Sequence, residues 1–314
     1  MLARILRFAA GFELLGALAL ASVLVHYSVL LWLAVVLAAM LPLAVHGVPL
    51  AIEFITGAVV DRRPVARLGL VALTGVWARE TWRSFKVFNV DQPWRAGFAE
   101  VIVHDPLRPA VLFIHGYMCN RATWRPWLID HGLARRWNCA TVNLEPVFGG
   151  VDHYQPTIHA AVERLLAGSG AERVTLVCHS MGGLAARSFL RVHGHRAVAR
   201  VVTIDTPHHG TLFARLGHGE NSRQMQLACN YVRGLAESDE PVGFVCFASQ
   251  HDNLIVPRDG QILACAEAIW FERIGHLSMT DNDQVLAKLI EVVERPLPEA
   301  NTARTRETAA AAGS

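Results

Sequence analysis

The feature that most restricts how this chain can fold is the run from Tyr27 to Ile52, which contains no Asp, Glu, Lys or Arg. A helix needs about 20 mostly apolar residues to cross a bilayer. This run and the apolar stretch before it therefore predict two membrane spans, at about 6–25 and about 28–50. Of the 314 residues, 52% are apolar and only 18% are charged, and most of the apolar excess lies in these two stretches.

The two predicted spans are joined by a very short connection, residues 26–28, so residues 1–60 are expected to form a helical hairpin. Glu13 lies in the first span, where a carboxylate is tolerated only near an interface. Basic residues flank the open end of the hairpin and do not occur at its tip: Arg4, Arg7, Arg62, Arg63 and Arg67. The positive-inside rule then predicts a protein of a bacterial-type inner membrane, with both termini in the cytoplasm.

Two other interpretations of the N-terminus remain open. A basic start, an apolar stretch and the small-residue site Ala19-Leu20-Ala21 also fit a secretory signal peptide, whose cleavage would leave a secreted or periplasmic protein. The apolar hairpin could instead be buried inside a soluble protein. Residues 61–86 are expected to form a juxtamembrane linker, in which 65–85 form either an amphipathic helix on the membrane surface or an ordinary linker helix.

Charge, cysteine and histidine usage excludes several functional classes. The net charge is +2, from 29 Lys+Arg and 27 Asp+Glu, so no nucleic-acid partner is expected. The six cysteines form no C-x-x-C pair and are spread over a large domain, which favours free thiols over a disulfide framework. The 15 histidines include no H-E-x-x-H pattern, and we predict neither a metal nor a cofactor. Residues 296–314 hold little apolar bulk and are expected to be a disordered tail.

From about residue 87 the sequence alternates between short apolar runs and longer helical patterns. The runs that predict strands are 99–103, 110–114, 139–144, 174–178, 200–204, 243–248 and 268–274. The stretches that predict helices are 121–136, 153–168, 181–193, 260–266 and 281–294. Nearly continuous apolar strands alternating with helices indicate an α/β fold, with a mostly parallel sheet covered by helices on both faces. In such sheets the active site forms beyond the carboxyl ends of the strands.

The predicted strand 174–178 ends in His179-Ser180-Met181-Gly182, and a helical pattern follows at once. A serine on such a tight strand-to-helix turn presents its hydroxyl above the sheet, and the backbone N–H of Met181 can face a developing oxyanion. The usual pattern for this turn is G-x-S-x-G, and here Cys178 replaces the first glycine. A buried serine in a structural turn is the alternative reading of this segment.

Residues 113–117, Phe-Ile-His-Gly-Tyr, span the end of the predicted strand 110–114 and the loop after it. Gly116 lets this loop fold back, so that the N–H of Tyr117 can join that of Met181 in an oxyanion hole. His115 is expected to brace the loop rather than to take part in the reaction. With His179 and Gly182, His115 and Gly116 are the residues expected to shape the site.

A general base and an acid are available on two later loops. His276 follows the last predicted strand, and Asp252 follows the strand 243–248. His276 would take the proton of Ser180, and Asp252 would orient the imidazole and stabilise the imidazolium. Asp205, at the end of strand 200–204, is a rival carboxylate. Asp252 is preferred because it follows the strand 243–248, the position at which a site of the order Ser…Asp…His carries its acid.

These motifs resemble the α/β-hydrolase superfamily and, within it, bacterial triacylglycerol lipases and related esterases. The resemblance rests on F-I-H-G-Y, V-C-H-S-M-G-G, I-D-T-P-H-H-G-T, H-D-N-L-I-V-P and G-H-L-S, and it covers about residues 100–295. It implies a catalytic domain at 87–295 with a lid at about 211–241. The apolar residues of the lid are expected either to face an acyl chain or to pack in the domain core. The structural calcium of some relatives cannot be assigned to particular residues here.

The function that this resemblance and the residues predict is that of a membrane-anchored serine hydrolase. It would cleave carboxylic esters, with lipidic esters favoured, through an acyl-enzyme on Ser180. Its expected partners are an ester or lipid substrate and the membrane, and the sequence predicts no oligomeric state. Two alternatives remain open: an acyltransferase that uses the same Ser180, Asp252 and His276, and a non-catalytic membrane scaffold on a hydrolase fold.

Overall fold

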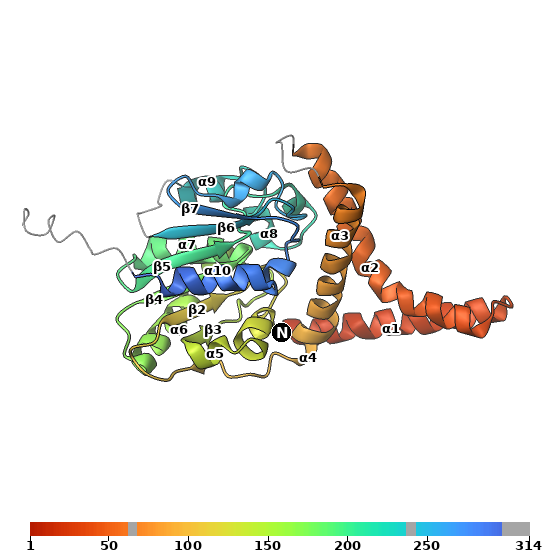
Figure 1. Ribbon diagram of the computed structural model, residues 1–314, viewed down its shortest axis with the longest axis horizontal. Coiled ribbons are helices and arrows are strands. Elements are labelled where there is room, and N and C mark those ends of the chain that lie inside the picture. The colour runs from red at the N-terminus through yellow and green to blue at the C-terminus, as the bar shows by residue number, and fades with distance from the viewer. Residues whose placement is uncertain (62–67, 237–242, 297–314) are drawn as a thin grey trace, which may run out of the picture.

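A computed structural model describes residues 1–61, 68–236 and 243–296 of the chain. In Figure 1 a helical hairpin at the N-terminus projects from an α/β domain, and a third helix, α3, stands at the junction between them. The predicted tail therefore lies, apart from Pro296, outside the described residues, and so does the part of the predicted lid at 237–242.

The α/β domain is built on a seven-stranded sheet in the order β1-β3-β2-β4-β5-β6-β7. Its strands are β1 (Val101–Ile102), β2 (Ala110–Ile114), β3 (Asn138–Thr141), β4 (Val174–His179), β5 (Val198–Ile204), β6 (Phe244–Ser249) and β7 (Glu267–Phe271). β1 pairs antiparallel with β3, and every other pair is parallel. All seven strands expected from the sequence are present, and the predicted mostly parallel sheet is confirmed.

Helices cover both faces of this sheet (Figure 1). Successive strand side chains point to opposite faces, so Leu176 of β4 joins the core beneath α6 (Gln155–Ser169) and α7 (Met181–His193). Val177 joins the opposite core, beneath α5 (Leu133–Arg136) and α10 (Asp283–Glu294). The four central strands are buried along nearly their whole length, and they carry the candidate site at their carboxyl ends.

The hairpin consists of α1 (Leu2–His26) and α2 (Leu31–Val60), which contains Pro42 and Pro49. Both helices are long and apolar enough to cross a membrane, and most of their side chains are not buried in the protein. Leu2 and Leu6 of α1 pack against Val147 of the α/β domain. The hairpin therefore contacts that domain at the start of α1, and its tip lies far from it (Figure 1).

The segment expected to be a linker contains α3 (Leu70–Phe85), which continues through a π-helical turn at Lys86–Asp91 into α4 (Gln92–Trp94). The indole N–H of Trp77 on α3 donates to the carbonyl of Gly47 on α2 (2.8 Å). A methyl group on Gly47 would lie 3.0 Å from the Trp77 ring, so the glycine permits this close helix packing. α3 thus packs between α2 and the α/β domain. Neither the amphipathic surface helix nor the ordinary linker helix expected from the sequence included these contacts.

Two local predictions differ from the structure. The helix expected at 260–266 is wrong: only a 3-10 turn, Arg258–Gln261, forms there, and it ends where Ile262 adopts an extended conformation (φ −113°, ψ 134°). The stretch 121–136 is divided among a 3-10 turn, a π turn and α5. The described part of the predicted lid holds a 3-10 turn at Leu212–Arg215, α8 (Glu220–Gln224) and α9 (Asn230–Ala236).

Candidate active site

Ser180 lies on the turn between β4 and α7 with backbone angles φ 53° and ψ −127°. A non-glycine residue rarely adopts a positive φ, and such strain persists only where the surroundings enforce it. Two glycines supply those surroundings. A methyl group on Gly182 would lie 2.5 Å from the carbonyl oxygen of Ile114, and one on Gly183 would collide with Thr206. The start of α7 therefore packs closely against the end of β2 and the loop after β5, and this packing enforces the turn at Ser180.

The loop after β2 packs directly on this turn. A methyl group on Gly116 would lie 2.8 Å from the Cβ of Ser180, so the glycine brings the backbone of Tyr117 beside the serine. Met181 is the first residue of α7, where a backbone N–H has no carbonyl partner within the helix. The two expected oxyanion donors, Tyr117 and Met181, therefore flank Ser180.

His115 braces the loop. Its Nδ1–H donates to the carbonyl of Gly116 (2.9 Å), and its Nε2 accepts from the N–H of Leu144 (3.0 Å). Burial lowers the pKa of His115 to about 4, so the ring is neutral, as these two hydrogen bonds require. His179 has a comparable supporting role, since its Nε2–H donates to the backbone carbonyl of His276 (3.1 Å). Burial also lowers the pKa of His179 well below the usual range.

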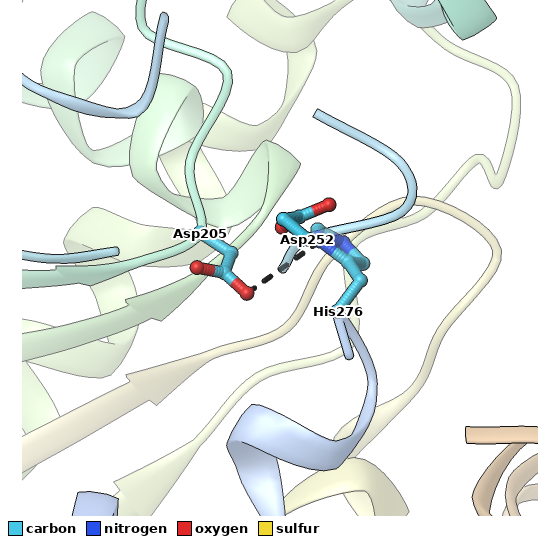
Figure 2. A group of neighbouring side chains, drawn as sticks. All are labelled: Asp205, Asp252 and His276. Atoms are coloured by element: carbon cyan, nitrogen blue, oxygen red, sulfur yellow. Dashed lines mark hydrogen bonds and ion pairs between the residues drawn. The ribbon is translucent and has the colours of Figure 1, made fainter. Parts of the chain in front are cut away.

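The structure brings His276 and Asp252 together, from the loops that follow β7 and β6. The Nδ1–H of His276 donates to Oδ2 of Asp252 at 2.8 Å (Figure 2). Burial disfavours the imidazolium, but the Asp252 carboxylate outweighs it and raises the pKa of His276. Burial likewise opposes the carboxylate, but His276 and the backbone N–H of Ile255 outweigh it and lower the pKa of Asp252. The pair is therefore a hydrogen-bonded imidazole and carboxylate.

The rival carboxylate, Asp205, lies in the same cluster, with its oxygen 3.9 Å from Nδ1 of His276 (Figure 2). Burial, together with the Asp252 carboxylate, raises the pKa of Asp205 well above its usual range. Of the two neighbouring carboxyl groups, Asp205 is therefore the one shifted toward its neutral form. Its other contact is with the backbone N–H of Ser249 (2.8 Å), so it supports the loop that carries Asp252.

Asp205, Asp252 and His276 also place possible metal-ligand atoms within 4.8 Å of one another. This donor set fits a cation poorly, because burial and Asp252 shift the Asp205 carboxyl group toward its neutral form, and Nδ1 of His276 carries the hydrogen that it donates to Asp252. All six cysteines are free thiols. Burial raises the pKa of Cys178 beside the site, so this thiol is not an activated nucleophile.

Sequence reasoning missed the acidic residues that the N-terminal helices bring to this site. Glu80 of α3 is fully buried, and its carboxylate accepts from the N–H of Leu277 (2.6 Å), the N–H of Ser278 (3.0 Å) and the hydroxyl of Ser278 (2.6 Å). Glu53 of α2 accepts from the side-chain amide of Asn253 (2.6 Å). In the sequence, the only signal for such a role was that Glu53 interrupts an apolar run. This signal did not indicate which residue Glu53 contacts.

Ser180 opens onto two cavities, of about 320 and 230 Å³. Both are lined by Ser180, Tyr117, Glu53 and Leu254. The larger also reaches His276 and the helices α2 and α3, whereas the smaller extends beneath Phe213, Leu216 and Met225 of the predicted lid. Val232 and Leu235 of the same segment are buried in the domain core. The segment 211–236 therefore both lines a cavity and contributes to the core.

Comparison with known proteins supports a relationship to lipases. The sequence model of the PGAP1-like alpha/beta domain matches residues 155–264. Two triacylglycerol lipases, from Pseudarthrobacter phenanthrenivorans and Burkholderia plantarii, are each 46% identical to the chain over 55 residues. Those residues are 18% of this chain and 17% and 15% of the two lipases, so the match spans under a fifth of each relative.

Solved structures share the fold. The mature form of a Bacillus licheniformis lipase aligns with a TM-score of 0.51 and 17% identity, over 60% of this chain and 93% of that lipase. Aspergillus fumigatus lipase B aligns with a TM-score of 0.52 and 15% identity, over 68% of this chain and 61% of that lipase. The chain thus has the α/β-hydrolase fold, and it resembles triacylglycerol lipases.

Proposed function

We propose that this protein is a carboxylic ester hydrolase that acts on lipidic esters through an acyl-enzyme on Ser180. The observation that carries the proposal is the 2.8 Å hydrogen bond between Asp252 and His276, with the imidazole and Ser180 facing one cavity. Because Nδ1 is engaged by Asp252, Nε2 is the nitrogen left to act on the serine hydroxyl.

In the proposed reaction the Oγ of Ser180 attacks the ester carbonyl carbon as Nε2 of His276 takes the hydroxyl proton. The negative charge on the former carbonyl oxygen is stabilised by the N–H groups of Tyr117 and Met181. When the tetrahedral intermediate collapses, the bond from carbon to the alcohol oxygen breaks, and His276 gives its proton to the departing alcohol. A water molecule, deprotonated by His276, then attacks the acyl-enzyme, releasing the carboxylic acid and returning the proton to Ser180.

Three observations support a lipidic substrate met at a membrane. The two hairpin helices expose apolar side chains along most of their length. The cavities beside Ser180 are lined mainly by apolar residues. The relatives matched by sequence are named triacylglycerol lipases.

The flanking arginines favour a cytoplasmic catalytic domain, and the packing of Leu2 and Leu6 on Val147 favours an uncleaved N-terminus.

A series of p-nitrophenyl esters from acetate to palmitate tests this function, with the detergent-solubilised protein and its Ser180→Ala variant as the blank. We expect kcat/KM to rise with acyl-chain length, because a longer chain buries more apolar surface beneath the lid segment. Turnover of short esters alone would contradict a lipidic substrate. Transfer of the acyl group to added alcohol, with little free acid formed, would instead favour the acyltransferase alternative.

A further inference from the structure

The two cavities that meet at Ser180 differ in one catalytically decisive residue. His276 lines the larger cavity and not the smaller one. The general acid must reach the oxygen of the leaving alcohol, so the alcohol departs on the side where His276 lies. The acyl chain then occupies the other side, where the smaller cavity runs beneath Phe213, Leu216 and Met225.

We propose that the larger cavity binds the alcohol portion of an amphiphilic membrane ester, and that α2 of the hairpin forms one wall of this subsite. The inference rests on the proposed ester hydrolysis. α2 contributes Val45, His46, Pro49, Leu50 and Glu53 to the wall, and the loops of the α/β domain form the opposite wall. The hairpin is therefore part of the substrate site as well as an anchor.

The mixed character of this wall suits an amphiphilic alcohol. Val45 and Leu50 offer apolar surface, while the Nδ1 of His46 is hydrogen-bonded to the hydroxyl of Ser84 (2.9 Å). Its Nε2 lies 3.1 Å from the side-chain amide of Asn89. Polar groups thus lie on an otherwise apolar surface, as expected where part of a ligand is polar and part is hydrocarbon.

The wall is tied to the loops that carry the catalytic residues. Glu53 accepts from the amide of Asn253, and the oxygen of that amide accepts from the backbone N–H of His276 (3.0 Å). At the end of α2, Asp61 forms a buried ion pair with Arg258 (3.4 Å), whose Nε–H donates to the carbonyl of Asp252 (3.0 Å). These contacts fix the position of α2 relative to His276.

The same wall leads to the outer surface of the hairpin. The side chain of Val45 lines the cavity and is 46% exposed. On the turns of α2 nearer the tip of the hairpin, Leu37 and Met40 are exposed apolar residues within the predicted span. A hydrocarbon chain on the alcohol can therefore extend from the cavity along α2 into the bilayer without exposing apolar surface to water.

Val45→Trp tests the subsite, and Val48→Trp is the matched control, because Val48 is 59% exposed on the same helix and does not line the cavity. The two measured substrates are methyl butyrate and octyl butyrate in mixed micelles with dodecyl maltoside. Val45→Trp is expected to lower the ratio of kcat/KM for the octyl ester to that for the methyl ester by at least about tenfold. Val48→Trp should leave this ratio unchanged.

An unchanged ratio in Val45→Trp would overturn the subsite while leaving the proposed hydrolysis intact. A Val45→Trp variant that loses activity selectively on methyl dodecanoate would also overturn the subsite, because that result would place the acyl chain along α2. If the wild-type protein hydrolyses none of these esters in a Ser180-dependent way, the proposed function fails and the subsite fails with it.

A separate observation, the hydrogen bonding of Glu80, supports a second inference. We infer that Glu80 is a positioning residue that holds the loop carrying His276. Its carboxylate receives three hydrogen bonds from Leu277 and Ser278, directly after His276. The loop is also closely packed there, since a methyl group on Gly275 would collide with the Glu80 carboxylate. α3 thus supports the general base from outside the α/β domain.

Glu80→Gln and Ser278→Ala each remove part of this contact, and Thr74→Ala is the control on an exposed turn of α3. We expect each of the first two variants to lower kcat about 10- to 100-fold, the range for displacement of a catalytic group by about 1 Å. KM should change little, and the rate of Ser180 labelling by a fluorophosphonate should fall in parallel with kcat. The double variant should lose less than the product of the two single losses.

A lowered melting temperature with unchanged kcat and labelling rate would show that Glu80 is merely structural and would overturn the inference. If the loss of kcat in the double variant equalled the product of the two single losses, the inference would also be overturned, because Glu80 and Ser278 would then act separately.

Discussion

Ser180→Ala is expected to lower kcat for ester hydrolysis by on the order of 10⁴- to 10⁶-fold, the range found when a serine hydrolase loses its nucleophile. The physical reason is that no other nucleophile lies on the turn after β4. The neighbouring thiol, Cys178, is fully buried, and its raised pKa keeps it protonated. Substrate binding should persist, because the variant removes only the hydroxyl group.

The measurement combines steady-state hydrolysis with covalent labelling by a fluorophosphonate, detected by intact mass. The wild-type protein should gain one label and Ser180→Ala none. Ser169→Ala is the matched control, since Ser169 is also buried, and its hydroxyl donates to the carbonyl of Leu165 and accepts from the N–H of Ala171, away from the site. Labelling of Ser180→Ala at the wild-type rate would exclude Ser180 as the nucleophile. An unlabelled wild-type protein would favour the non-catalytic scaffold.

Asp252→Asn is expected to lower kcat by on the order of 10⁴-fold, as loss of the orienting carboxylate does in the serine-protease template. An amide at this position can donate to Nδ1 of His276, which moves the ring hydrogen to Nε2. The imidazole then cannot accept the proton of Ser180. Asp205→Asn is the matched control, because Asp205 is equally buried but lies 3.9 Å from Nδ1 of His276 and is not hydrogen-bonded to it. Its expected loss is at most about tenfold, from the weaker support of the Asp252 loop.

The pH dependence provides an independent measurement on the same variants. His276 must be neutral to act as a base, and the Asp252 carboxylate raises its pKa above 6.5 despite burial. In the wild-type protein kcat/KM should therefore rise with pH, with its midpoint above 6.5. Removing the carboxylate destabilises the imidazolium, so the residual activity of Asp252→Asn should have its midpoint at lower pH. A larger loss or shift in Asp205→Asn than in Asp252→Asn would show that the acid has been misassigned.

Much of the fold could be predicted because its signals are local. Each central strand is a short apolar run bounded by polar residues, and the helix after Ser180 begins where Gly182 and Gly183 allow close packing. The candidate site residues could be predicted for the same reason. Parallel strands place their carboxyl ends at one edge, so the loops bearing Ser180, Asp252 and His276 converge once the strands are assigned. The helix predicted at 260–266 failed because the side chain of Gln261 is held by the backbone of Ser249 on β6, a tertiary contact that leaves no local signal.

By itself, then, the sequence predicted the two apolar helices, the mostly parallel sheet and the candidate residues for the proposed serine-dependent ester chemistry. Only the tertiary structure decided how these parts meet. The contact of Glu80 with Ser278 and that of Glu53 with Asn253 join residues 198 and 200 positions apart. Such pairs leave no periodic or local signal, because a contact depends on where two distant segments pack. The raised pKa of Asp205 beside Asp252 likewise depends on burial and proximity, which exist only in the folded chain.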